Sequence, residues 1–572
     1  MDKSRRKTLA SFKTLGSAAI IASMFPATAA VARPGLRVKS DWVDPRDFGA
    51  IADGTSHPLS ARYRTLGDAR AVYPFAATLG HEIDWCAIQA AINAGAQVKV
   101  SRGHFRINET LSLRSNSEIR GAGPDTVLIW SRNEQAEVFS MFGAQGVTGI
   151  RLGNFSVLDN SGSRGGYVFA GNNVIDVQVE KLVSKGMAIA AFEASAEVSD
   201  RYDHVVIDTA GAKFNGSADV HVSGCAASDV AASSDPCAAV LFRYCIGWSV
   251  TNCKFSNTPF GVQWWGGDSD PERDGALMNR RKCLHGAVTN VEVSNCIAGV
   301  WGSMGSDVRI SGCEVDTASD VGIDFEGCVN CVASQNRVRN CANGNFTIFW
   351  WNVGISFVEN VSRQRRSDYP HLRVYNASQG IENHSLLVKG NQFSTEGTIG
   401  VIDTGSGCVE KLDFLDNDLL DTKVEFVANN LRYVNVTGNT VTFSLLASRP
   451  FYAIQVGELH NSGRGLVERN TIESKVAQPR GTSAIYLWSD DYNADTQFEV
   501  VMNRTVGFQI DLVTDNKGRN PGKTSYFMIE GNVFGARAYR KEEHGSKASS
   551  CFLRANQGIQ DSVGKPWSTS GM

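Results

Sequence analysis

The chain has 572 residues and a formal net charge of −3, from 56 basic and 59 acidic residues. This balance excludes a broad basic surface of the kind that binds nucleic acid or anionic membranes, so a neutral or polar ligand fits better. The 56 glycines and only 14 prolines are typical of many short strands joined by tight turns. Length alone suggests several domains, but a periodic chain can form one elongated body because each repeat buries its face on its neighbours.

The first 32 residues have the organisation of an export signal. A basic stretch, Ser4 to Leu9, precedes an apolar run, Leu15 to Ala27, and a small-residue end, Ala30 to Ala32. Arg5 and Arg6 resemble the pair of a twin-arginine signal, although Thr8 stands where that motif usually has Phe. An ordinary secretory signal is the alternative. No later stretch has about 18 continuous apolar residues. We therefore expect an exported protein, periplasmic or secreted, without a membrane span.

The segment after this signal predicts short strands around one helix. A strand and turn are expected from Asp44 to Gly54. Asp84 can cap a helix that runs through Ala94, because apolar residues recur at helical spacing from Trp85 and Gly95 closes the pattern. Short strands are then expected at 98–100, 103–107 and 119–123.

The order of these motifs resembles the opening of the pectate-lyase-like superfamily, including its pectate lyase type 3-like members. The motifs are Asp-Phe-Gly-Ala at 47–50, Asp-Gly at 53–54, Ala-Ile-Gln-Ala-Ala-Ile at 87–92 and Ile-Arg-Gly-Ala-Gly at 119–123. The superfamily includes polygalacturonase-related enzymes and tailspike-type proteins. The resemblance covers about residues 44 to 130 and implies a right-handed parallel β-helix, but not one particular reaction. The segment from Thr55 to Glu82 is longer than the usual gap.

A short repeat runs from Val293 to Asn352 and then continues along the chain. Two segments within it, 299–304 and 322–327, alternate apolar and polar residues with the period of a strand. One anchor residue per repeat is expected at a turn, where stacked Asn side chains satisfy the backbone and serve as scaffold. The expected anchors are Asn154, Cys225, Cys253, Cys296, Cys313, Asn336, Asn360, Asn391, Asn417, Asn439, Asn470 and Asn532.

The thirteen cysteines are an odd number, and ten of them lie between Cys225 and Cys341. Cys328 and Cys331 have the two-residue gap that is used in zinc and redox sites. Because other cysteines of this group occupy anchor positions, we favour stacked small buried side chains over a metal site. A few disulfides after export remain open.

The strongest candidate for chemistry is a pair of carboxylates, Asp324 and Glu326. Alternation along Ile323-Asp324-Phe325-Glu326 places both acids on one face of a strand, which we expect to be exposed to solvent. Their Cβ atoms would be roughly 6–7 Å apart. Glycoside hydrolysis needs an acid and a second carboxylate about 5–9.5 Å apart, and mutual repulsion would raise the pKa of one of them. Two solvated acids or a cation site are the alternatives.

Asp320 lies just before this strand and is a candidate third acid. The run from Ser319 to Asp324 loosely resembles the acid motif of polygalacturonases. The gap between the two aspartates is three residues here rather than two, and the chain has neither the adjacent Asp-Asp pair on the next repeat nor a Gly-His-Gly. The resemblance therefore supports cleavage of another polysaccharide better than polygalacturonase activity.

Aromatic and polar residues should line the same face if the strands stack in register. The expected outward positions are Gln263 with Trp265, Trp301 with Ser303, Thr347 with Phe349, and Arg373 with Tyr375. Flat apolar rings beside hydrogen-bonding groups suit a sugar ring, so Gln263, Trp265 and Trp301 are candidate substrate-binding residues. The alternative is that the tryptophans pack beneath the loop 266–285. Four acidic residues in that loop could bind a cation, but we favour a solvated loop.

A lyase is the nearest rival to a hydrolase. β-Elimination needs a base and a positive group, which His371, Arg373 and Tyr375 could supply from one strand face, and a calcium ion could join them. An epimerase would use similar groups. A glycan-binding or tailspike-like protein would need only the aromatic groove.

The sequence thus predicts an all-β protein, a right-handed parallel β-helix with a short N-terminal capping helix. The expected parts are the signal at 1–32, the cap and first coils at 33–130, the β-helix at 131–535 and a C-terminal cap or tail at 536–572. A polysaccharide is the expected partner, without nucleic acid. No resident cofactor is expected for a hydrolase, and formation of a homo-oligomer remains open.

Overall fold

The computed structural model describes residues 42–95, 97–131, 139–159, 166–193, 216–230, 238–266, 283–349, 352–375, 385–404, 409–489, 495–517, 524–536, 539–543 and 548–558. The export signal expected at 1–32 and the acidic residues of the loop 267–282 lie outside these ranges. The described residues form two compact units. Unit 1 contains those up to Ile297, and unit 2 contains those from Ala298 onward.

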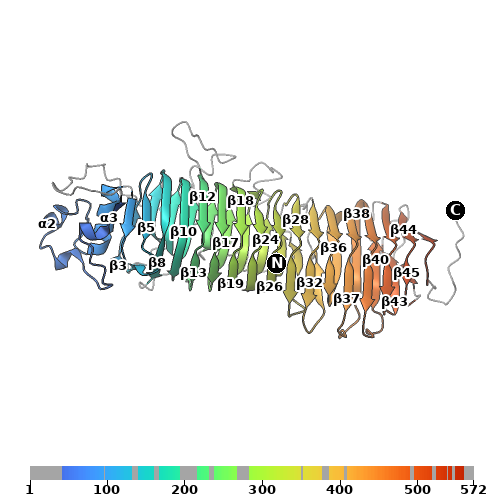
Figure 1. Ribbon diagram of the computed structural model, residues 1–572. Helices are drawn as coiled ribbons and strands as arrows, with labels where there is room; N and C mark the ends of the chain where they lie inside the picture. The colour runs from blue at the N-terminus through green and yellow to red at the C-terminus, as the bar shows by residue number, and fades with distance from the viewer. Residues whose placement is uncertain are drawn as a thin grey trace. The chain divides into compact units, whose positions relative to one another are not determined.

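Each unit consists of three stacks of parallel strands, to which successive coils of the chain contribute one strand each. In unit 1 the stack that contains Gln263 and Trp265 runs through β9 (Gly166–Asn172), β11 (Ala188–Glu193), β14 (Ala238–Arg243) and β17 (Phe260–Trp265). The printed pairings of both units are parallel, and such crossovers are right-handed in nearly all proteins. The expected right-handed parallel β-helix is confirmed (Figure 1).

In unit 2 the corresponding stack is longer, and we call its outward side the site face. It consists of β20 (Ala298–Ser303), β24 (Val321–Glu326), β27 (Gly344–Phe349), β30 (Leu372–Tyr375), β33 (Gly400–Asp403), β36 (Thr422–Thr437), β38 (Tyr452–Glu468), β40 (Ser483–Ser489), β43 (Ile510–Asn516) and β46 (Tyr539–Glu543). β46 and the last described strand, β47 (Ala548–Arg554), continue the parallel pairing inside the segment that we expected to be a cap or tail.

The core of each coil is filled by one side of its strands. In β24, Ile323 and Phe325 are fully buried, and Phe325 packs against Phe357 of β28 (Ile355–Val358), a strand of another stack, with ring centroids 5.9 Å apart. Alternation with period two explains this arrangement, because it separates the inward apolar residues from the outward polar ones.

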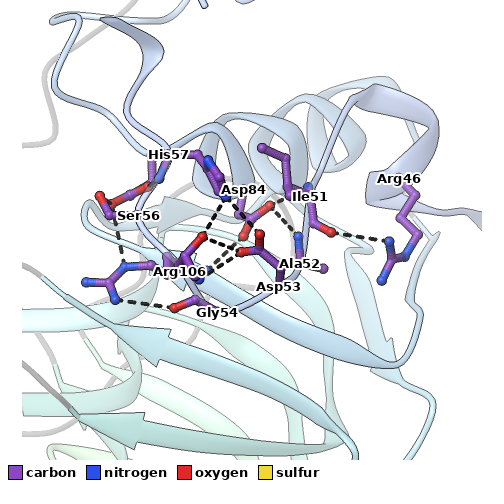
Figure 2. A network of polar contacts seen from close by, with 11 residues as sticks. Arg46, Ile51, Ala52, Asp53, Gly54, Ser56, His57, Asp84 and Arg106 are labelled. Carbon is purple, nitrogen blue, oxygen red and sulfur yellow. Dashed lines mark hydrogen bonds and ion pairs between the residues drawn. The ribbon is translucent and has the colours of Figure 1, made fainter. Parts of the chain in front are cut away.

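Two short helices, α2 (Leu66–Arg70) and α3 (Ile83–Ala94), lie at the N-terminal end of unit 1 (Figure 1). The prediction of the longer helix is confirmed, but its cap is different. Glu82 is the N-cap residue and makes no side-chain cap hydrogen bond. Asp84 lies inside the first turn, and its buried carboxylate accepts hydrogen bonds from the backbone N–H groups of Ile51 (2.6 Å), Ala52 (3.0 Å) and Arg106 (3.1 Å) (Figure 2). The helix therefore holds the preceding loop to the first coil.

The anchor residues form a ladder of side chains in unit 2. Asn360, for example, accepts a hydrogen bond from the backbone N–H of Asn336 at 2.9 Å and donates to the carbonyl of Ala333 at 2.9 Å. A residue with positive φ precedes each rung, as Glu359 does with φ 55°. The predicted scaffold role is confirmed from Asn336 to Asn532, and Asn503 and Asn556 are additional rungs.

Two predicted anchors of unit 1 are wrong. Cys296 follows Asn295, which has a φ of 53°, and this turn is the equivalent of Asn257 and Thr258 rather than of Cys253. Asn154 is itself the left-handed residue of its turn, with φ 63°. Both errors arise because every coil has more than one tight turn, and a polar or small residue suits each of them.

None of the described helices is long and apolar enough to cross a membrane.

Candidate functional site

The site face of unit 2 brings the predicted residues into two columns. In the first column Trp301, Asp324, Thr347 and Arg373 are direct neighbours on successive strands. In the second column Ser303, Glu326, Phe349 and Tyr375 are neighbours in the same way. The predicted register is therefore confirmed across these four strands.

The expected exposure of the two carboxylates is wrong. Asp324 is 0% exposed and Glu326 is 3% exposed, and every residue of β24 is buried. Their neighbours Trp301, Ser303 and Thr347 are buried as well. Alternation assigned the acids to the outward side of the strand correctly, but the outward side of this stretch is not in contact with solvent.

Glu326 has a short hydrogen bond with its column neighbour. The Ser303 hydroxyl donates to Oε2 of Glu326 at 2.5 Å, a length that is typical of a hydroxyl bonded to a carboxylate. Asp320, the candidate third acid, lies before β24, and its Oδ1 accepts a hydrogen bond from the side chain of Asn343 at 2.6 Å. Its assignment to catalysis stays a prediction.

The candidate sugar-binding residues divide between the two units. In unit 1, Gln263 is the neighbour of Leu241 and Trp265 is the neighbour of Arg243 on the adjacent strand. Gln263, Trp265 and, in unit 2, Trp301 are all buried. The alternative that the tryptophans are covered rather than exposed therefore describes them better. Trp264 points inward and packs against Trp248 with ring centroids 5.9 Å apart.

His371 does not lie on the site face as a base would. Its ring is fully buried, with Nδ1 2.7 Å from the hydroxyl of Ser362 and Nε2 2.8 Å from that of Thr395. It also packs edge-on against Phe393. Burial lowers the pKa of His371 to about 3, because a charged imidazolium is costly away from water. The residue precedes β30 and turns into the coil interior, which alternation within the strand did not reveal.

Among the predicted residues of this face whose side chains the structure describes, Arg373 is the most accessible. Its side chain is 28% exposed, and its Nη2 lies 3.6 Å from Oδ2 of Asp403 on the next strand. Tyr375 occupies its expected register position, and its side chain lies outside the described part of the chain.

The sequence reasoning missed a cluster of aromatic and charged residues further along the site face. Tyr486 and Trp488 project from β40, and the Tyr452 ring stacks on Tyr486 with centroids 4.1 Å apart. Tyr486 donates a hydrogen bond to Oδ2 of Asp515 at 2.9 Å. Burial and this bond raise the pKa of Tyr486. The alternation of Tyr486-Leu487-Trp488 was a signal that could have found two of these residues.

The described ranges contain no three His, Cys, Asp or Glu side chains that are grouped to hold a metal ion. No disulfide joins two of the described cysteines, ten of which are buried. Burial raises the pKa of the Cys245 thiol well above its usual value. Buried thiols of this kind are unreactive, which agrees with the predicted packing role.

No protein-family model and no curated protein sequence matches the chain. Solved structures with similar architecture include the tailspike protein gp49 from Pseudomonas phage LKA1, with 15% sequence identity over 89% of this chain and 84% of that chain and a TM-score of 0.45. The N-terminal fragment of bacteriophage Phi29 gene product 12 shares 11% identity over 90% and 93% of the two chains, with a TM-score of 0.46.

The Streptococcus pneumoniae surface protein and adhesin PfbA is similar over 90% of this chain and 99% of its own, with 10% identity and a TM-score of 0.31. Identities this low say nothing about shared chemistry.

Proposed function

We propose that this chain is a glycan-binding β-helix protein that hydrolyses its glycan with Asp324 and Glu326. The observation that carries the proposal is the pair of in-register columns on the site face, where both acids lie beside Trp301 and Phe349. Glycoside hydrolysis requires two carboxyl groups, and aromatic neighbours suit the binding of a sugar ring.

The hydrogen bond from Ser303 suggests how the two acids divide their roles. A hydroxyl that donates to Glu326 stabilises the ionised carboxylate, which suits the base or the nucleophile. Asp324 lies two residues before Glu326 on the same strand, beside Trp301 and Thr347, and would then be the acid that protonates the leaving oxygen. Because both acids are buried, the substrate must displace what covers them before it reacts.

A polymer lying along the strand stack fits the site face better than a small sugar. From Asp324 the first column continues in register through Arg373, Asp403 and Glu425 to Tyr486. These are six strand spacings of about 4.8 Å, or roughly 29 Å. Arg373, Asp403 and Glu425 are partly exposed and offer donors and acceptors to sugar hydroxyls.

The burial of the acids favours a second candidate, a glycan-binding protein without catalysis. Such a protein needs the accessible polar column and the aromatic residues, but no reactive carboxylate. A lyase that uses His371 as its base is disfavoured, since that ring lies in the coil interior. The twin-arginine-like signal at residues 1–32 supports export, and therefore a glycan outside the cytoplasm as the partner.

The test is to incubate the purified protein with a panel of neutral and acidic bacterial and plant polysaccharides while following reducing ends and near-ultraviolet absorbance. We expect reducing ends without absorbance. Asp324→Asn and Glu326→Gln should each lower turnover by at least about a hundredfold and leave polysaccharide binding intact. Asp316→Asn, on the neighbouring β23 (Glu314–Ala318), is the matched control and should keep full activity.

A product that absorbs in the near ultraviolet would show that the reaction is elimination and not hydrolysis. Binding without any new ends would establish the second candidate, and unchanged turnover in both acid variants would reject the assignment of the catalytic pair.

A further inference from the structure

We propose that Tyr486, Trp488 and Asp515 form a cation box for the protonated amine of an amino sugar, and that the ammonium of Lys517 occupies this box in the structure. The inference rests on the proposed function only in taking a glycan as the ligand. It narrows the substrate class to polysaccharides with free amino groups.

The box is built by two neighbouring strands of the site face. Trp488 on β40 and Asp515 on β43 are direct partners in register. The indole needs a glycine beneath it, because a Cβ atom on Gly457 would lie 2.0 Å from Nε1 of Trp488. Tyr486 is held by its hydrogen bond to Asp515 and by the stacked ring of Tyr452. The walls are therefore fixed by packing.

Lys517 shows which chemistry these walls accept. Its Nζ lies 4.1 Å from the centroid of the Trp488 ring, 5.5 Å from that of Tyr486 and 3.8 Å from Oδ2 of Asp515. Two aromatic faces and a carboxylate around one ammonium are the elements with which proteins recognise alkylammonium ligands. The lysine ammonium thus stands in for a primary amine of the same kind.

The Lys517 side chain can move out of the box, whereas the residues that form the box are held in place. Its side chain is 38% exposed, and the Asp515 side chain it approaches is 1% exposed. The backbone N–H of Lys517 donates to the carbonyl of Ser489 at 2.8 Å, so the chain stays in place when the side chain swings out. A released lysine regains its rotamer freedom, which lowers the cost of exchange for a ligand amine.

A glucosamine unit matches the box in charge and in shape. Its amine is a primary ammonium on a ring that can lie against the partly exposed Tyr452. N-acetylation removes this charge and adds bulk, so the box should reject the acetylated sugar. Tyr486 lies in the column that leads to Asp324, so a polymer bound here would extend toward the proposed catalytic pair.

The experiment compares glucosamine oligomers with N-acetylglucosamine oligomers of equal length by isothermal titration calorimetry on the full chain. We expect wild type to bind the glucosamine series at least tenfold more tightly. Lys517→Met keeps the apolar stem and removes the competing ammonium, so it should tighten glucosamine binding about three- to fivefold. Asp515→Asn keeps an acceptor for the Tyr486 hydroxyl and should weaken glucosamine binding about tenfold. Lys411→Met removes a lysine of another strand stack, on β34 (Lys411–Leu415), and should change neither affinity.

Equal affinity for the two series, or the same affinity in wild type and Lys517→Met, would overturn the box. These outcomes are separate from those of the proposed function. Cleavage of other polysaccharides without preference for glucosamine oligomers rejects the box alone. Binding of glucosamine oligomers that depends on Asp515, without release of reducing ends, supports the box and rejects the hydrolase. Melting curves of each variant establish that it is folded.

Discussion

The two units differ in the side chains that occupy the same turn of the coil. In unit 1 the residue that follows the left-handed residue of this turn is Cys225 in one coil and Cys253 in the next. The backbone N–H of Cys225 donates to the sulfur of Cys253 at 3.4 Å. In unit 2 Cys313 is followed by rungs that are asparagines from Asn336 onward. Their amides both accept from a backbone N–H and donate to a carbonyl.

The comparison shows that this position requires a buried side chain but not a hydrogen bond, because Leu182 aligns with Cys225 in the preceding coil. A thiol fits the space and packs as a small apolar group, but it is a weak donor and acceptor. An amide of similar length satisfies the backbone on both sides of the rung. The asparagine ladder should therefore contribute more stability per rung than the cysteine rungs.

The largest effect is expected for Asn417→Ala, in the middle of the asparagine ladder. The substitution removes the acceptor of the Asn391 N–H and the donor to the Val388 carbonyl. Because both groups are buried, we expect the free energy of unfolding to fall by about 3 kcal/mol. Urea unfolding measures this change. A loss below about 1 kcal/mol would show that the asparagine side chains only fill space and that their hydrogen bonds do not stabilise the fold.

A somewhat smaller effect is expected for Asp84→Asn in unit 1. An asparagine keeps one acceptor oxygen, but its NH₂ group would face one of the three backbone donors that the carboxylate now satisfies. We expect a loss of about 2 kcal/mol, with hydrogen exchange rising first at Ile51, Ala52 and Arg106. Unchanged protection of these three amides would contradict the role of Asp84 as the link between the helix and the first coil.

Acid should destabilise unit 2 through His371. The folded protein holds the pKa of His371 at about 3, below the ordinary value of 6.5 for a histidine, so between these two pH values the unfolded state binds one more proton. Stability therefore falls as the pH decreases from 6.5, by at most about 1.4 kcal/mol per unit, or on the order of 2 kcal/mol at pH 5. In His371→Gln the dependence of unfolding free energy on pH should be flatter. Parallel curves for the two proteins would show that other groups cause the acid sensitivity.

The smallest effect is expected for Cys253→Ala, the counterpart of Asn417→Ala in unit 1. The substitution removes the sulfur that accepts from the Cys225 N–H at 3.4 Å, the weak thiol bond to the Thr251 carbonyl at 3.2 Å and a small buried volume. Because sulfur contacts are weak, we expect about 1 kcal/mol. Urea unfolding under the same conditions gives the ratio between the two substitutions. Equal losses would remove the distinction between the two ladders.

Much of the fold could be predicted from short-range patterns. Period-two alternation and the recurring Asn identified the strands and the rungs, because in a β-helix each coil repeats the same local geometry. The helix that ends at Ala94 and the register of Trp301, Asp324 and Thr347 followed from the same kind of pattern.

The environment of the site could not be predicted in this way. Alternation tells which side of a strand a residue occupies, but the burial of Asp324 and Glu326 depends on what covers that side. His371 precedes β30, so alternation within the strand does not tell that its ring points into the coil. The box around Lys517 joins residues of two successive coils, on β40 and β43. The repeat and its strand faces could thus be predicted from the order of the amino acids, because they are local properties of the backbone. Which outward residues contact water and which contact each other depends on the neighbouring coils, so these properties followed from the three-dimensional structure alone.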